Sequence, residues 1–314
     1  MILVEDPSGV PAELRPSAVT IGKFDGVHTG HRAVLAQLKE EAAGRGLPSV
    51  VVTFDRNPLA VLRPELCPAN VVSVRQKLEL LEQEGVDGTL LLRFDTALAA
   101  WTPERFVSRV LVEALEAKVV LVGADFRFGA RGAGDRALLE ELGRGADFEV
   151  VVVDDVSTGG ARASSSRVRT LLGDGDVEGA AELLGRAPRM RGVVVPGLRR
   201  GRELGYPTAN LEPDAEGFAP GDGVYAGRLI DHSAAGAPVY PAAISVGTNP
   251  TFGDVARKQV EAYVLDEDID LYGHVVEIEF LHRLRGMVAY HGVEPLREQM
   301  ARDVEQTREL VPRS

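Results

Sequence analysis

The sequence predicts an α/β protein in two parts: a three-layer domain with a parallel sheet, then an antiparallel barrel or sandwich closed by a helix. Three observations predict it. Apolar, valine-rich runs alternate with helical patterns in the first half, which is typical of a parallel sheet. From Val193 on, the apolar runs are short and separated by Gly, Pro and Asp turns, which is typical of antiparallel strands. The length of 314 residues favours two domains.

The first half contains five candidate strands and four candidate helices. The strands fall near residues 18–22, 49–54, 89–94, 118–123 and 149–153. The helical patterns lie near residues 31–44, 74–84, 103–116 and 135–142. Ligands of such sheets bind at the carboxyl ends of the strands, so we expect the site beyond these ends.

The second half begins after a helical stretch near residues 166–184 and a Pro- and Arg-containing linker at 185–191. Short β-rich runs follow near residues 192–197, 223–231, 239–246, 259–266 and 274–282. A closing helix over 294–310 has a candidate apolar stripe of Leu296, Met300, Val304 and Leu310. We therefore predict two domains, 1–185 and 186–314.

Composition limits the class of protein. The net charge of −12 argues against a general nucleic-acid binder, which would usually show a basic face. A single cysteine, Cys67, excludes an intrachain disulfide and a thiolate zinc site. No window approaches the length of an apolar membrane span, and Met1–Pro7 does not resemble a signal peptide. We expect a cytoplasmic protein without membrane or nucleic-acid partners, either a monomer or a weak homo-oligomer.

The segment V-T-I-G-K-F-D-G-V-H-T-G-H, from Val19 to His31, carries the strongest functional signal of the first half. It runs from the end of an apolar strand into a helix, so His28 and His31 lie near a helix N-terminus. Backbone N–H groups and the helix dipole favour anions there, and two imidazoles could hydrogen-bond phosphate oxygens. Gly30 leaves room for a phosphate to approach the backbone. The alternative is a capping or solvated histidine.

This segment resembles the H-x-G-H motif of the nucleotidyltransferase superfamily. With G-K-F-D-G-V in front, it resembles the adenylyltransferase half of bacterial FAD synthetase. The resemblance implies a Rossmann-like nucleotidyltransferase domain in which His28 and His31 are catalytic as electrostatic stabilisers. It also implies binding roles for Gly22, Phe24, Asp25 and Gly30.

The segment T-F-D-R-N-P, from Thr53 to Pro58, departs from the family pattern T-F-x-P-H-P. Asn57 stands where the family usually has a histidine. An amide can donate and accept hydrogen bonds but cannot be protonated, so Asn57 cannot supply the positive charge that a histidine could. We keep Asn57 as a binding candidate, with a plain strand-to-loop turn as the alternative.

Two further segments of the first half resemble the same family. V-G-A-D-F-R-F-G at 122–129 matches its flavin and nucleotide loop, which implies contacts from Asp125, Phe126, Arg127 and Phe128. S-S-S-R-V-R at 164–169 resembles the I-S-S-T-x-x-R signature, in which hydroxyls, helix N–H groups and an arginine hold phosphates. The resemblance implies binding roles for Ser164, Ser165 and Ser166 and a catalytic role for Arg169. A serine cap with a solvated arginine is the alternative.

In the second half, G-R-E-L-G-Y-P-T-A-N-L at 201–211 resembles the riboflavin kinase motif. The match implies a nucleotide-binding segment that includes Gly201, Arg202, Gly205 and Pro207. Thr208 and Asn210 point the same way along an extended segment, and their oxygens suit Mg²⁺. Glu261 aligns with the family's catalytic glutamate, a group suited to taking a proton from an alcohol. A turn and a solvated strand residue are the alternatives.

The resemblance covers nearly the whole chain and implies a bifunctional enzyme, with an antiparallel β-barrel riboflavin kinase domain and a closing helix at 186–314. ATP and riboflavin would give FMN in the C-terminal domain. ATP and FMN would then give FAD and pyrophosphate in the N-terminal domain. Mg²⁺ is the expected cofactor. Two alternatives stay open: only one activity is retained, with adenylyl transfer at risk from Arg56-Asn57, or the chain is a flavin-binding regulator.

Overall fold

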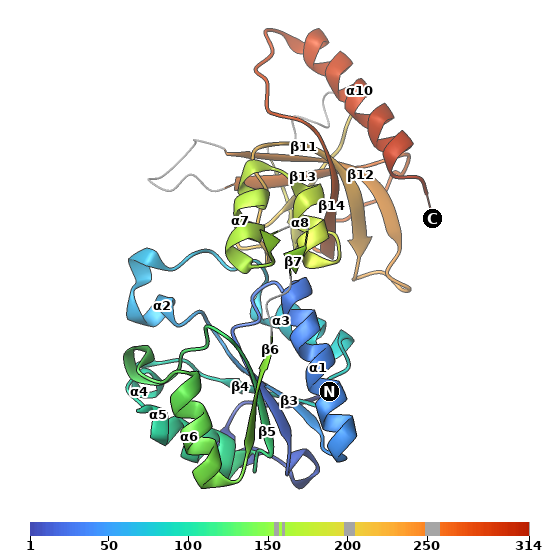
Figure 1. Ribbon diagram of the computed structural model, residues 1–314. Helices are drawn as coiled ribbons and strands as arrows, with labels where there is room; N and C mark the ends of the chain where they lie inside the picture. Colours follow the sequence, from blue (N-terminus) through green and yellow to red (C-terminus); the bar gives the residue numbers. More distant parts are fainter. Residues whose placement is uncertain (154–156, 159–160, 198–204, 249–257, 314) are drawn as a thin grey trace. The chain divides into compact units, whose positions relative to one another are not determined.

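The computed structural model describes residues 1–153, 157–158, 161–197, 205–248 and 258–313 (Figure 1). The chain forms two compact units, Met1–Ser164 and Ser165–Ser314. Within the described residues, no helix has the length and apolar character needed to cross a membrane.

The first unit contains a six-stranded parallel sheet in the order β1-β4-β3-β2-β5-β6. Its strands are β1 (Ile2–Val4), β2 (Ala18–Ile21), β3 (Ser49–Phe54), β4 (Gly88–Leu92), β5 (Val119–Gly123) and β6 (Glu149–Val153). The predicted parallel sheet is confirmed, and β1 is an additional edge strand. Because β2 pairs with β3 on one side and with β5 on the other, the strand order reverses beside β2. Such a switch point is where open α/β sheets bind ligands.

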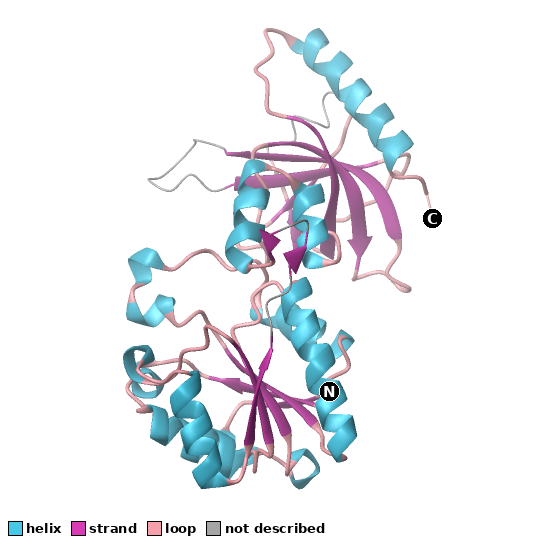
Figure 2. Ribbon diagram, in the orientation of Figure 1, coloured by secondary structure: helices cyan, strands magenta, loops and turns pink. Residues whose placement is uncertain are grey.

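Helices cover both faces of this sheet (Figure 2). The bounds are α1 (Thr29–Arg45), α2 (Leu59–Leu62), α3 (Val74–Gln83), α4 (Thr96–Ala99), α5 (Pro103–Phe106) and α6 (Arg136–Ala146). The predicted helix at 103–116 is α5 continued as a π-helical segment, Val107–Ala114. On one face, this segment and α6 bury Val110, Leu111 and Leu139 against the sheet. On the other, α1 buries Leu35 and Leu38.

Short elements complete the unit. Four 3₁₀ turns lie at Pro7–Gly9, Ala12–Leu14, Pro64–Leu66 and Ala130–Gly132. The strands β7 (Ser157–Thr158) and β8 (Ala161–Arg162) form a small antiparallel pair.

The second unit contains a closed barrel in the order β10-β13-β12-β11-β14-β9. Its strands are β9 (Arg189–Val195), β10 (Ala209–Leu211), β11 (Gly223–Asp231), β12 (Val239–Thr248), β13 (Lys258–Val264) and β14 (Val275–Arg285). All neighbours pair antiparallel, so the barrel, and not the sandwich, is the fold. Its core includes the T-shaped pair Tyr225 and Phe280, with ring centroids 5.6 Å apart.

Among the described residues of this unit, the helices are α7 (Ser165–Asp174), α8 (Val177–Leu184) and α10 (Val293–Leu310). The predicted stretch at 166–184 is two helices, because Gly175 adopts φ +80° between them. Gly221 N–H donates to the Leu172 carbonyl at 2.7 Å, and Arg283 donates to the Asp174 carbonyl at 2.6 Å. These bonds tie α7 to the barrel, and α8 packs against β14, so both helices fold with the barrel. The predicted domain border at 185/186 lies after α8. It stays a prediction of where the adenylyltransferase part ends and the kinase part begins.

Two local expectations were wrong. The predicted linker at 185–191 overlaps β9, because Arg189 and Arg191 are not solvated charges but pair with the buried Glu277 at 2.8 and 2.9 Å. Leu310 is 46% exposed and does not continue the apolar stripe of α10, whose buried residues are Asp303 and Thr307.

Candidate active sites

The two predicted histidines lie together at the start of α1. His28 is the N-cap residue, and its Nδ1 accepts a hydrogen bond from the His31 backbone N–H at 3.3 Å. The two rings stack with centroids 3.7 Å apart. Since Nδ1 of His28 accepts this bond, a neutral ring carries its proton on Nε2. His28 is therefore a helix cap whose ring is held by the His31 N–H and stacked on the His31 ring.

The loop before these histidines is strained. Phe24 and Val27 have φ of 49° and 38°, in the left-handed region that bulky and β-branched residues rarely adopt. Strain of this kind clusters at functional sites. A side chain at Gly30 would place its Cβ 3.2 Å from the His28 ring, so glycine permits the stacked arrangement.

The strand order brings two predicted segments to the same edge of the sheet. The histidine turn follows β2, and the predicted segment from Ala124 to Phe128 follows β5, the neighbour of β2. Asp125 accepts a hydrogen bond from Arg162 at 2.9 Å. Phe126 stacks on Phe128 with centroids 5.4 Å apart. Phe128 is only 7% exposed and belongs to the core, so the structure gives it a packing role, and its substrate contact stays a prediction.

The segment after β3 reaches the same edge. Asn57 lines a small polar pocket together with Asp25 and Lys77. Its Oδ1 accepts a hydrogen bond from the Leu59 N–H at 3.1 Å, which fits a turn that starts α2.

Lys77, which lines the same pocket, was not predicted from the sequence. The signal was its spacing with Leu80 and Leu81, which places a lysine on the buried side of α3.

The serine and arginine signature is divided between the units. Ser164 ends the first unit, and Ser165, Ser166 and Arg169 lie on the first two turns of α7 in the second unit. Their joint action with the histidines stays a prediction.

In the second unit, β10 and β13 bring Thr208, Asn210 and Glu261 together. Asn210 and Glu261 are directly opposed across the two strands. Thr208 Oγ1 donates a hydrogen bond to Glu261 Oε2 at 3.1 Å. Asn210 is 6% exposed; its Nδ2 donates to the Thr208 carbonyl at 3.2 Å, and its Oδ1 accepts from Gln259 at 2.9 Å. Two oxygens and one carboxylate thus form a preorganised polar cluster.

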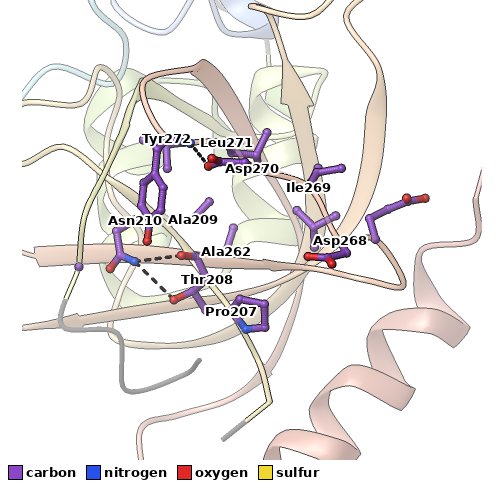
Figure 3. Close-up of a pocket in the computed structure, with 14 residues that line it drawn as sticks. Pro207, Thr208, Ala209, Asn210, Ala262, Asp268, Ile269, Asp270, Leu271 and Tyr272 are labelled. Atoms are coloured by element: carbon purple, nitrogen blue, oxygen red, sulfur yellow. Dashed lines mark hydrogen bonds between the residues drawn. The ribbon is translucent and has the colours of Figure 1, made fainter. Parts of the chain in front are cut away.

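Two pockets meet at Thr208. The first is polar: it is lined by Thr208, Asn210 and the segment from Glu267 to Tyr272, which includes Asp268 and Asp270 (Figure 3). The second is largely apolar: its lining includes Tyr206, Tyr263, Tyr290, Leu296 and Met300, together with Thr208 and Glu261. Asp268, Asp270 and the three tyrosines were not singled out from the sequence, because single acidic and aromatic residues carry no spacing signal.

Other predicted residues of this motif are partly outside the described residues. Gly201 and Arg202 fall there, as does the segment 249–257. Gly205 has φ +88°, and Pro207 lines the polar pocket.

Comparison with known proteins follows the same division. A family model described as FAD synthetase matches residues 10–167, and one described as riboflavin kinase matches residues 184–311. The bifunctional riboflavin kinase/FMN adenylyltransferase of Escherichia coli K12 is 38% identical over 292 residues, which are 93% of this chain and 92% of that protein. This chain belongs to the bifunctional riboflavin kinase/FMN adenylyltransferase family.

Other similar proteins are consistent with membership of this family. The bifunctional riboflavin kinase/FMN adenylyltransferase of Pseudomonas fluorescens is 36% identical and covers 99% of this chain and 98% of its own. A crystal structure described as a macrolide-efflux protein from Streptococcus pneumoniae has a TM-score of 0.86 and 32% identity over 98% of both chains. The bifunctional family's fold therefore recurs in that structure.

Proposed function

We propose that the barrel unit makes FMN from riboflavin and ATP, and that the parallel-sheet unit makes FAD from FMN and ATP. The observation that carries the kinase assignment is the position of Thr208 and Glu261 where an apolar aromatic pocket meets a polar one. A flat, largely apolar ring system such as that of riboflavin suits the apolar pocket, and a nucleotide suits the polar pocket. The riboflavin hydroxyl and the ATP phosphate would then meet beside the Glu261 carboxylate.

In the kinase reaction, a riboflavin hydroxyl oxygen forms a bond to the γ-phosphorus of ATP. The bond from that phosphorus to the ADP oxygen breaks, and Glu261 takes the hydroxyl proton. Glu261 accepts a hydrogen bond from Thr208, which orients its carboxylate. Positioning and charge neutralisation supply most of the catalysis in such displacements.

The residues present fit a Mg²⁺ ion shared with substrate phosphates. Mg²⁺ prefers oxygen ligands and keeps several waters, so it needs only one or two protein ligands. Thr208 Oγ1 and Asn210 Oδ1 would be these ligands, and Asn210 is held by Gln259 and by the Thr208 carbonyl. A bound Mg²⁺ would neutralise phosphate charge. Gly205 and Pro207, and by resemblance Gly201 and Arg202, would shape the nucleotide side of this site.

In the adenylyl transfer, a phosphate oxygen of FMN forms a bond to the α-phosphorus of ATP, and pyrophosphate leaves. No proton need be removed, because the FMN phosphate is already an anion. His28 Nε2–H and His31 would stabilise the charge that develops on the phosphates. Ser165, Ser166 and Arg169 would bind phosphate oxygens in the same reaction.

The remaining predicted residues would shape the flavin and nucleotide side of this site. They are Gly22, Phe24, Asp25, Gly30, Asn57, Asp125, Phe126, Arg127, Phe128 and Ser164.

Product analysis with two variants tests the assignment. Riboflavin and Mg·ATP are supplied to the full chain, and FMN and FAD are separated over time. The parent should give FMN and then FAD. His31→Ala should stop at FMN, with FAD formation reduced by on the order of 10²-fold or more, as for loss of a transition-state donor. His282→Ala, a histidine of the barrel surface paired with Glu178, is the matched control and should give both products.

The alternatives have distinct outcomes. Formation of FMN alone by the parent would mean that adenylyl transfer has been lost. Flavin binding without either product would indicate a regulator. FAD formation by His31→Ala at the parental rate would contradict the role given to this histidine.

A further inference from the structure

Lys77 is a buried lysine that the proposed chemistry does not use. It is 7% exposed, and its ammonium donates hydrogen bonds to the Phe54 carbonyl at 2.6 Å and to Thr53 Oγ1 at 3.2 Å. Its third oxygen neighbour is the Lys23 carbonyl, at 3.5 Å. Thr53 Oγ1 in turn donates to the same Lys23 carbonyl at 3.2 Å. One ammonium and one hydroxyl thus join the carboxyl ends of β2 and β3.

The two segments that Lys77 joins are those that carry site residues. Lys23 opens the loop that leads to His28, and Phe54 ends β3 shortly before Asn57. The loop contains Phe24 and Val27 in left-handed backbone conformations, with φ of 49° and 38°. Such conformations persist only where the surroundings hold them. The contact from Lys77 to the Lys23 carbonyl is one of the restraints on this loop.

A second restraint on this loop comes from the residues that immediately precede α3. Asp25 Oδ1 accepts hydrogen bonds from the backbone N–H groups of Val71 at 2.9 Å and Val72 at 3.4 Å, just before α3. The α3 segment therefore holds the loop at two points, a backbone carbonyl and a carboxylate.

A buried charge at this position lowers the stability of the fold, so packing alone does not explain why a lysine stands here. Burial lowers the pKa of the Lys77 ammonium to about 8, against the opposing effect of Asp25 and Asp55. The charged groups around it are Lys23 and Asp25 on the loop after β2, and Asp55 and Arg56 on the segment after β3. An apolar residue in a buried position often gives equal or greater stability than a charge.

We propose that Lys77 is a positioning residue for adenylyl transfer, which fixes the histidine turn relative to the segment after β3 through the Lys23 and Phe54 carbonyls. The inference rests on the proposed role of the histidines. Lys77 does not contact the reacting atoms in this account. It keeps His28 and His31 in the geometry in which they bind phosphate oxygens.

Lys77→Met tests this, because methionine keeps the unbranched shape and removes the donors. We expect kcat for FAD formation from FMN and ATP to fall by about 10²-fold, the scale of a small misplacement of catalytic groups. FMN formation from riboflavin, by the other unit, should be unchanged. Lys39→Met is the matched control: Lys39 also donates to a backbone carbonyl of the α3 region, that of Glu84, but at the opposite end of the helix. It should leave both rates unchanged.

The pH profile separates positioning by the charge from general damage to the fold. The ratio of the parental rate to the Lys77→Met rate should shrink as pH rises through about 8, because the parent then loses the ammonium that the variant lacks. A ratio that does not change with pH would overturn the proposal. So would a Lys77→Met rate of FAD formation within about threefold of the parent, too small a change for a lost positioning contact.

Thr53→Val provides a second variant in case Lys77→Met does not fold. It removes the hydroxyl between Lys77 and the Lys23 carbonyl, and should lower FAD formation by about tenfold. Combined with Lys77→Met, the two effects should be less than additive, since they act on one network. Full additivity would contradict the proposal. If His31→Ala loses FAD formation while Lys77→Met retains it, only this inference fails; if His31→Ala retains it, the histidine role itself fails.

Discussion

Replacing Lys77 with Met should change how the stability of the first unit depends on pH. Burial lowers the pKa of this ammonium from 10.5 to about 8 in the folded chain. Between these two values the unfolded chain holds one more proton than the folded chain, so the free energy of unfolding of the parent rises with pH. Below about pH 8 the cost of the buried charge is fully present. The variant has no such group.

The size of the effect follows from the shift. One pKa unit corresponds to about 1.4 kcal/mol, so the parent should gain about 2–3 kcal/mol relative to Lys77→Met from about pH 7 to about pH 10. The hydrogen bonds lost with the ammonium, to Phe54 and Thr53, lower the stability of the variant by a part that does not depend on this titration. The pH-dependent difference therefore isolates the buried charge.

Urea unfolding over this pH range measures the difference. Trp101 is the single tryptophan of the chain and lies in the first unit, so its fluorescence reports that unit. We expect the free energy of unfolding of the parent, minus that of the variant, to rise steadily above about pH 8. A value that stays constant or falls as the pH rises would refute the reasoning, because it would mean that Lys77 keeps an ordinary pKa in the folded chain.

Three further outcomes follow from the second unit. Glu261→Gln should lower kcat for FMN formation by roughly 10²–10⁴-fold at an unchanged KM for riboflavin, because a general base is lost. Steady-state kinetics measure both constants, with Glu279→Gln as the control variant. Asp303→Asn should raise the KM for riboflavin by about tenfold, because it breaks a buried pair with Arg285 that holds α10 over the apolar pocket; an unchanged KM would exclude this role. A fragment of residues 165–314 should unfold at higher urea than one of 186–314, since α7 and α8 pack on the barrel; equal midpoints would show that they add nothing.

Much of the fold could be predicted because its signals are repetitive. Valine-rich strands that are buried on both faces, such as β3, read as continuous apolar runs, and a parallel sheet follows from their alternation with helices. The strands that were missed are short. The three residues of β1 and the three of β10 are too few to show a period, and β10 was read as a motif instead of a strand.

The start of β9 and the role of Lys77 could not be predicted, because both depend on charged residues whose partners lie far away in the sequence. Arg189 and Arg191 made the start of β9 resemble a linker, since the buried partner that satisfies them, Glu277, lies far along the chain. Lys77 was not predicted for a similar reason. Its oxygen partners come from β3 and from the loop after β2, and no pattern in the sequence around Lys77 indicates these contacts.

The histidines, by contrast, could be placed from the sequence, because a strand, a turn and a helix start are all local. His28 and His31 lie where the pattern put them, at the N-terminus of α1. The apolar pocket could not be anticipated, since its tyrosines and the α10 side chains meet only when the barrel closes.

The central claim is that two separate sites act in sequence, and mixing two variants tests it most directly. His31→Ala should make FMN but little FAD, and Glu261→Gln should convert FMN to FAD but make little FMN. Supplied with riboflavin and Mg·ATP, each variant alone should therefore accumulate little FAD. The account predicts that the mixture forms FAD after a lag, as FMN released by the first variant reaches the second. A mixture that forms no more FAD than the separate variants, although each retains its remaining activity, would contradict it.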